Sequence, residues 1–174
     1  MIYPIKLLMS FVVVLGFGYL GIIMSSVLSV RVKQIDILLL VLGRLEFNIG
    51  FLNMPIGDAM KHSASLAKGV IGNVFASAAK EINEGDVDPK TALSREMRRY
   101  SLDLCLNDED KEVLLVFSDN LGKGDMKREL NNIKCAMAKL KVLKEAAEGE
   151  TKRRGKLYKS VGFLIGLFIA IILF

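Results

Sequence analysis

Two runs without a charged residue, one near each end, limit what this chain can fold into. The first covers residues 7–30 and holds 24 residues, and the second covers residues 160–174 and holds 15. As α-helices they would measure about 36 Å and about 22 Å, against a hydrocarbon core of about 30 Å. The first run is longer than the apolar part of a secretory signal, and no Ala-x-Ala cleavage site precedes Arg31. We therefore expect transmembrane helices within residues 1–30 and 160–174.

The second run is short for a membrane span, but the residues before it can lengthen it. Tyr158 and the aliphatic stems of Lys156 and Lys159 can lie at the interface between lipid and water. Apolar residues occur on all sides of residues 163–174, which favours a membrane span over a buried core helix.

Basic residues flank both runs and predict the side of the membrane on which the middle of the chain lies. They follow the first run and precede the second: Arg31, Lys33, Lys152, Arg153, Arg154, Lys156 and Lys159. Because flanking basic residues are retained in the cytoplasm, we expect residues 31–159 to form a cytoplasmic domain. This domain has 23 basic and 19 acidic residues, and without residues 152–159 its net charge is −1. The positive charge therefore predicts contact with anionic lipids and argues against nucleic-acid binding.

Small residues recur at every fourth position within both expected spans. One set lies in the first span and one in the second: Gly21, Ser25 and Ser29, and Gly162, Gly166 and Ala170. Such a spacing places small residues on one helix face and lets two backbones approach closely, although glycine is also common in membrane helices without this role. We expect the two faces to pack on each other or on another membrane protein. Neither span holds an ionisable residue, so we expect no proton relay or ion site there.

Helix signals occur throughout residues 31–159, and no alternating strand pattern occurs there. Pro55 is suited to a first helical position, and Asp88 before Pro89 to an N-cap. The expected helices cover residues 34–51, 55–69, 70–82, 88–101, 107–122 and 125 onward, where the fifth begins at either Asn107 or Asp108. We therefore predict an all-α fold, an antiparallel bundle of about six helices flanked by N- and C-terminal transmembrane helices.

The last helix shows a short heptad pattern with Asp125 as its N-cap. The pattern consists of apolar residues at alternating steps of four and three: Met126, Leu130, Ile133, Met137 and Leu140. Because it covers barely two heptads, a bundle core is favoured over a free coiled coil.

The chain lacks the residue sets that common catalytic and metal sites require. It has one histidine, His62, which we expect at the surface, and two cysteines, Cys105 and Cys135, which we expect in buried structural positions. The sequence from Gly122 to Asp125 resembles part of a phosphate-binding loop but is better explained as a turn between two helices. Residues 108–110 are all acidic and are expected to complement a helix dipole. We expect no catalytic residue, metal site or cofactor, and hence no enzyme.

These residues, in this order, resemble the stage III sporulation protein AB family of endospore-forming bacteria over essentially the whole chain. The resemblance rests on four segments, of which the last is the most specific: the leucine-rich helix at 38–49, Met54-Pro55-Ile56 with Ala59, the turn from Leu114 to Asp125, and residues 155–162 with Gly166. Residues 69–101 match least, and the tryptophan expected near residues 91–95 is absent.

The resemblance implies a fold similar to the cytoplasmic helical domain of type II secretion inner-membrane platform proteins. It also implies a place in the complex that joins mother cell and forespore during engulfment. The protein would lie in the mother-cell-derived membrane around the forespore. Its implied partners are a cytoplasmic secretion-type ATPase and other membrane subunits of the complex.

Two functions agree with these expectations. The first is a non-catalytic membrane platform in a secretion-like sporulation complex. The alternative is a membrane-tethered regulatory adaptor unrelated to secretion, because anchors and a bundle suit it equally well.

Overall fold

A computed structural model describes residue 16, residues 29–85 and residues 87–173 of the chain. The chain divides into two units, one formed by Arg31–Glu145 and the other by Met1–Val30 together with Ala146–Phe174. We refer to Arg31–Glu145 as the compact unit. The described part of the chain is helical and contains no strand, which confirms the predicted all-α bundle.

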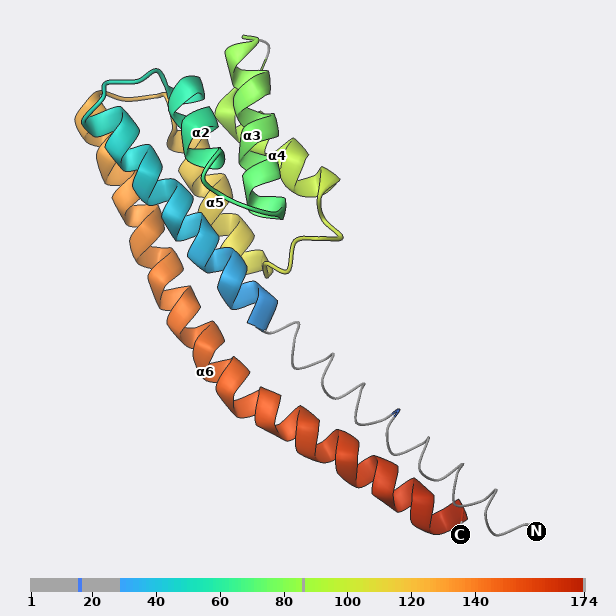
Figure 1. Ribbon diagram of the computed structural model, residues 1–174. Coiled ribbons are helices and arrows are strands. Elements are labelled where there is room, and N and C mark those ends of the chain that lie inside the picture. Colours follow the sequence, from blue (N-terminus) through green and yellow to red (C-terminus); the bar gives the residue numbers. More distant parts are fainter. Residues whose placement is uncertain (1–15, 17–28, 86, 174) are drawn as a thin grey trace. The chain divides into compact units, whose positions relative to one another are not determined.

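Six helices are found among the described residues (Figure 1). They cover residues 29–50, Ile56–Ala64 (α2), Val70–Asn83 (α3), Pro89–Arg99 (α4), Asp108–Asn120 (α5) and Met126–Leu173 (α6). The bundle predicted for residues 31–159 begins at the first residue of the compact unit, and the compact unit ends at Glu145.

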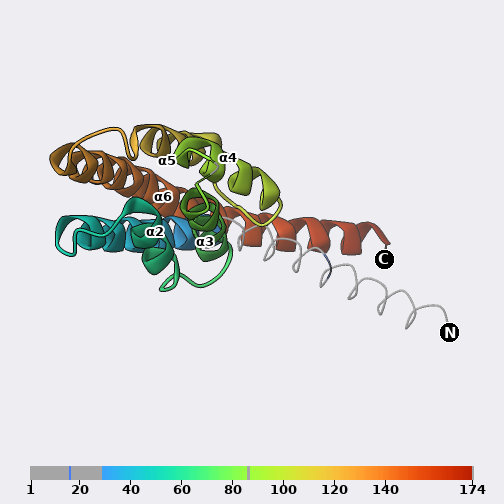
Figure 2. The ribbon, with the colours of Figure 1, turned by 90° about the horizontal axis from the view of Figure 1, so that it is seen from above.

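The helix of residues 29–50 and the first part of α6 run side by side in opposite directions (Figures 1 and 2). Two ion pairs and two close approaches at glycines join them, and the residue numbers in every pair add up to the same value: Asp36 with Lys144, Gly43 with Met137, Glu46 with Lys134 and Gly50 with Leu130. This constant register shows that the two helices stay paired along their length.

The remaining helices complete the core of the compact unit. In sequence order, α2 packs on α3, α3 on α4, and α4 on α5. Figure 2 shows α5 beside α6. The largest fully buried side chains come from every helix: Ile35, Leu38, Leu42, Leu45, Met60, Ile71, Phe75, Leu93, Leu114, Phe117, Leu121 and Ile133. Burial of apolar side chains stabilises such a bundle by about 1.5–3 kcal/mol for each large residue.

Local capping signals fix several helix ends as predicted. The Asp88 side chain accepts a hydrogen bond from the backbone N–H of Thr91, and Pro89 is the first residue of α4. Hydrogen bonds from Thr91 hold the pKa of Asp88 below its usual range. The helix of residues 29–50 ends where Asn53 takes a positive φ of 49° and the Met54 N–H donates to the carbonyl of Asn48.

The predicted end of the second helix is wrong. α2 ends at Ala64 rather than at Gly69, and Leu66 lies outside it with half of its surface exposed. Gly69 instead precedes α3 as its N-cap, with a φ of 84° that favours glycine. Pro55 is the N-cap of α2 and not its first helical residue.

The heptad pattern predicted for α6 is only partly buried. Ile133 and Leu140 are fully buried, whereas Met126 is 44% exposed. The buried line of this helix runs instead through Glu129, Ile133, Ala136 and Leu140. Leu130 and Met137 each follow a residue of this buried line directly in the sequence, and they face Gly50 and Gly43 of the 29–50 helix.

In the part of the chain that the structure describes, no helix is long and apolar enough to cross a membrane. The first expected span, apart from residues 16, 29 and 30, lies outside the described residues. Both transmembrane helices therefore stay predictions.

Gly72 in the first turn of α3 allows a close approach that predicts an unusual mutational effect. A Cβ at this position would run into the backbone carbonyl of Ala67 in the link from α2. Ala is normally the better helix residue by about 1 kcal/mol, so Gly149→Ala, with open space around Gly149, should stabilise. We expect Gly72→Ala to destabilise by about 1–3 kcal/mol. Thermal unfolding of both variants tests this, and equal effects of the two would contradict it.

Candidate functional site

The chain enters and leaves the compact unit at the same end. The Lys144 ammonium lies 2.6 Å from the Asp36 carboxylate, so that residues near the start and the end of the unit are adjacent. We call this the proximal end, defined by residues 31–36, residues 100–110 and residues 144–145. The predicted flanking basic residues begin here, with Arg31.

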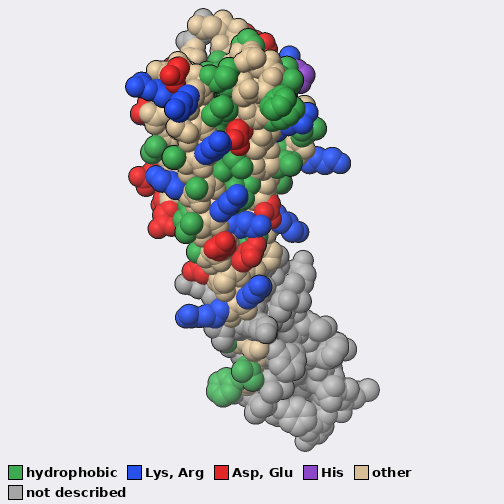
Figure 3. Space-filling view, turned by 90° about the vertical axis from the view of Figure 1, so that its left-hand side faces the viewer, with side chains coloured by type: hydrophobic (Ala, Val, Ile, Leu, Met, Phe, Trp, Pro, Cys, Tyr) green, Lys and Arg blue, Asp and Glu red, His purple; other side chains and the backbone are tan. Residues whose placement is uncertain are grey.

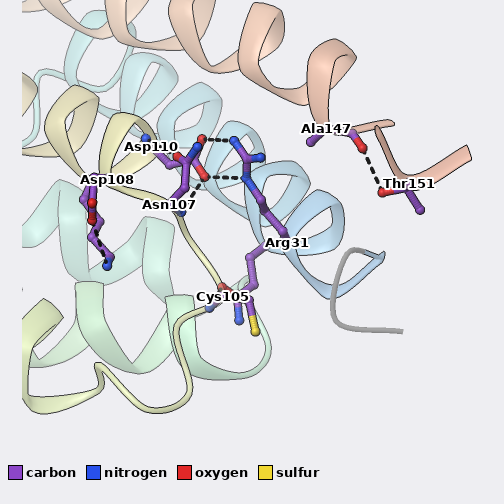
Figure 4. A network of polar contacts seen from close by, with 9 residues as sticks. Arg31, Cys105, Asn107, Asp108, Asp110, Ala147 and Thr151 are labelled. Carbon is purple, nitrogen blue, oxygen red and sulfur yellow. Dashed lines mark hydrogen bonds and ion pairs between the residues drawn. The ribbon is translucent and has the colours of Figure 1, made fainter. Parts of the chain in front are cut away.

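Arg31 forms a two-point ion pair with Asp110 at the start of α5 (Figure 4). Its Nε donates to Asp110 Oδ2 at 2.8 Å and its Nη2 donates to Oδ1 at 3.1 Å. The Asp110 side chain is completely buried and that of Arg31 is 15% exposed. A paired guanidinium and carboxylate in this geometry form a strong, oriented contact. The pair therefore ties the first turn of the compact unit to α5.

Asp110 also takes part in the cap of α5. Its backbone N–H donates to the Asn107 side chain, and its Oδ2 accepts from the Asn107 N–H at 3.0 Å. The two residues thus form a reciprocal capping box. The same carboxylate therefore caps the start of α5 and forms the ion pair with Arg31.

Gln34 holds the loop between α4 and α5 against the proximal end. Its Nε2 donates to the carbonyl of Asp103 at 2.9 Å, and its Oε1 accepts from the N–H of Cys105 at 2.8 Å. Gln34 is 6% exposed, and both contacts are partly buried. One side chain therefore satisfies two backbone groups of a loop that has no regular structure.

We expect Gln34→Ala to release this loop while leaving the helices folded. Two backbone groups would lose their partners, which costs about 1–3 kcal/mol for each buried group. Amide hydrogen exchange followed by mass spectrometry should show much faster exchange in peptides that contain Cys105. Unchanged protection of that segment would contradict the role given to Gln34.

The Arg31–Asp110 pair was not foreseen from the sequence. Arg31 was predicted as a flanking basic residue and Asp110 as a charge that complements a helix dipole. The structure gives both a specific partner, 79 residues away. No spacing signal joins residues so far apart, although an acid three positions after Asn107 is a recognisable capping-box pattern.

The other predicted flanking residues are described only in part. Lys33, Lys152 and Arg153 are exposed. Arg154, Lys156 and Lys159 lie in α6, and their side chains are outside the described part of the structure. Their role in orienting the chain across a membrane stays a prediction.

The small-residue faces are likewise untested. Gly21 and Ser25 lie outside the described residues, and Ser29 is helical. Gly162, Gly166 and Ala170 all fall within α6, where a spacing of four places them on one helix face. The predicted packing of these faces stays a prediction.

The few residues suited to metal or redox chemistry are spread apart. His62 is exposed, as predicted, and Cys105 is half-buried. Cys135 is exposed on α6, so the prediction of a buried structural position is wrong for this residue. Among the described residues, no group of three or more histidine, cysteine or acidic side chains could hold a metal ion. The acidic residues 108–110 belong to the start of α5.

The turn from Gly122 to Asp125 joins two helices and is held by Glu129. Gly122 has a φ of 82° directly after α5, and Asp125 caps α6 by accepting from the Arg128 N–H. The buried Glu129 accepts from the N–H groups of Gly122 and Gly124, at 2.9 and 3.2 Å. This turn therefore uses its backbone donors internally, in agreement with its interpretation as a helix link.

Comparison with known proteins gives one consistent family. A family model described as "Stage III sporulation protein AB" matches residues 6–174. A relative of that description from Bacillus subtilis (strain 168) is 27% identical over 169 residues, which cover 97% of this chain and 99% of the relative. A solved structure described as "Stage III sporulation protein AB (SpoIIIAB)" aligns with a TM-score of 0.62 at 26% identity. That alignment covers 68% of this chain and 94% of the solved one.

Proposed function

Because the chain belongs to the stage III sporulation protein AB family, we propose that it is a non-catalytic platform subunit of a secretion-like membrane complex. This complex links the mother cell and the forespore during endospore formation. The chain lies in the mother-cell-derived membrane around the forespore, with two spans and with its bundle in the cytoplasm.

The observation that carries this proposal is that the chain enters and leaves the compact unit at one end. Asp36 and Lys144 are in contact there, and the charge-free runs belong to segments outside the compact unit. A unit that is entered and left at the same end can stand on one face of a bilayer while both flanking segments lie in the lipid. This arrangement suits an anchored platform.

A platform must also keep its helices in one arrangement when partners bind to it. Arg31 and Gln34 fasten the proximal end, and Glu129 fastens the turn between α5 and α6. Hydrogen bonds and ion pairs of this kind between distant parts of the chain favour one well-defined arrangement of helices. The bundle is therefore suited to hold a partner in a fixed orientation.

The proposed partners are those that the family resemblance implies. A secretion-type ATPase binds the bundle from the cytoplasm. Other membrane subunits of the complex pack on the small-residue faces of the spans. Anionic lipids contact the basic residues that precede the second span.

Co-sedimentation tests the platform role. The full chain is inserted into phosphatidylcholine liposomes, and a purified secretion-type ATPase from the same organism is added. We expect the ATPase to sediment with liposomes that carry the chain and to stay in solution with empty liposomes. If it stays in solution in both samples, the platform role loses its main support.

Disruption of the gene separates this role from that of an adaptor unrelated to secretion. The platform predicts that sporulation stops after engulfment while vegetative growth stays normal. An adaptor of another pathway predicts a defect in growing cells or no arrest at this stage.

A further inference from the structure

The end of the bundle opposite the proximal end carries an exposed apolar surface. We call it the distal surface and define it by Phe47, Phe51, Leu52 and Met126. Their exposed fractions are 42, 80, 50 and 44%. Residues 31 and 51 are about 30 Å apart along the helix axis at 1.5 Å per residue. An exposed phenylalanine pair about 30 Å along the helix from the residue at which the chain enters the compact unit is not explained by anchoring.

The aromatic side chains of this surface are fixed in place. The Phe51 N–H donates to the Phe47 carbonyl at 2.9 Å, which sets the two residues one helical turn apart. Their rings stack with centroids 5.5 Å apart and planes inclined by 8°. The Arg44 guanidinium lies 5.2 Å from the Phe47 ring centre. Because these contacts order the rings before any partner arrives, binding loses little side-chain entropy.

A groove of about 380 Å³ runs beside the rings, between the 29–50 helix and α6. It is lined by Gly43, Glu46, Phe47, Gly50, Phe51 and Leu130. The two glycines make room for the side chains of Met137 and Leu130 on α6, and Leu130 also lines the groove. Such a groove between two helices, edged by aromatic rings, has the shape that accepts the apolar face of a third helix.

Charge around the groove favours an acidic occupant. The only acid that lines it, Glu46, lies 3.6 Å from the Lys134 ammonium and is therefore compensated. Arg44, which lies beside the Phe47 ring, adds one positive charge next to the groove. Lys127 is exposed and lies seven residues before Lys134, so it is on the same face of α6. Figure 3 shows a side of the compact unit on which apolar, basic and acidic side chains are interspersed.

We propose that the distal surface and its groove bind an acidic amphipathic helix of the cytoplasmic ATPase, with apolar residues against Phe47 and Phe51 and carboxylates near Arg44 and Lys127. This inference rests on the proposed function, because it names the surface through which the platform holds that partner. The aromatic pair supplies the central contact, and the two cations orient the helix and speed its approach.

The test uses the full chain in phosphatidylcholine liposomes, which have no net charge, and purified ATPase. Phe51→Ala and Lys127→Glu change the distal surface. Leu102→Ala and Lys141→Glu are matched controls, because Leu102 is 98% exposed at the proximal loop and Lys141 is exposed on α6. Circular dichroism of each variant checks that the helices and the unfolding midpoint are unchanged.

We expect Phe51→Ala and Lys127→Glu each to weaken ATPase binding by about tenfold or more, and both controls to bind within about twofold of wild type. Raising the salt from 50 to 300 mM NaCl should weaken the wild type more than Lys127→Glu.

The possible failures are distinguishable. If the wild type binds and all four variants bind equally, the distal surface is not the site and the platform role stands. If the wild type does not bind, both proposals fail. If Phe51→Ala lowers self-association of the chain and leaves ATPase binding intact, the surface joins two copies and the inference is overturned.

Discussion

Replacement of Arg31 by alanine is expected to destabilise the compact unit by about 3–5 kcal/mol, the cost of leaving one charge of a buried pair without its partner. The Asp110 carboxylate is completely buried, so it cannot turn to water when the guanidinium is removed. The hydrogen bond from the Asn107 N–H to the carboxylate stays, but it does not neutralise the charge. Guanidinium-induced unfolding of the full chain in detergent, followed by far-ultraviolet circular dichroism, measures the change.

Two further variants separate the ion pair from a general loss of packing. The double variant Arg31→Met with Asp110→Asn removes both charges and keeps a side-chain oxygen that can accept from the Asn107 N–H, so we expect it to recover much of the lost stability. Lys80→Ala breaks a surface pair whose side chains are 76% and 59% exposed, and should cost less than about 1 kcal/mol. If Arg31→Ala costs no more than Lys80→Ala, the proximal end is not fastened by this pair.

Phe75→Ala is expected to destabilise the compact unit by about 3–5 kcal/mol, because it opens a cavity in the core. Phe75 lies in the middle of α3 and is completely buried. The matched control is Phe51→Ala, since Phe51 is 80% exposed and its removal leaves no cavity. The same unfolding measurement should show a large shift for the first variant and almost none for the second. Similar shifts for both would mean that α3 does not pack as described.

The match between sequence and structure is best where the signal is local. Asp88 before Pro89, Asn107 and Asp125 each cap a helix by accepting from the backbone N–H three residues further on. A short polar side chain so near to its donor in the sequence can be recognised without knowing the fold. The number of helices and most of their bounds follow from such signals.

Contacts between distant residues could not be predicted in the same way. The pairing of Arg31 with Asp110 and that of Gln34 with the loop at Cys105 depend on how the helices meet. The line of buried residues along α6 was also not predicted. It includes Glu129, whose buried carboxylate accepts hydrogen bonds from backbone N–H groups of the preceding turn. A pattern of apolar residues alone gives no reason to bury a carboxylate.

The exposure of the distal surface could not be predicted from the sequence for a related reason. Phe47 and Phe51 have the spacing of one helical turn, which is equally typical of a core face. Only the arrangement of the neighbouring helices leaves these rings at the surface. Their exposure, rather than their residue type, is what suggests a binding role.

Labelling of a single thiol tests the central claim, that the chain is anchored at both ends with its bundle in the cytoplasm. Cys135 is exposed on α6, and the variant Cys105→Ser leaves it as the only thiol in the chain. A maleimide that cannot cross membranes is added to intact cells and to inside-out membrane vesicles. We predict that Cys135 reacts in the vesicles and stays unlabelled in the cells. Labelling in intact cells, or recovery of the chain in the soluble fraction, would contradict the account.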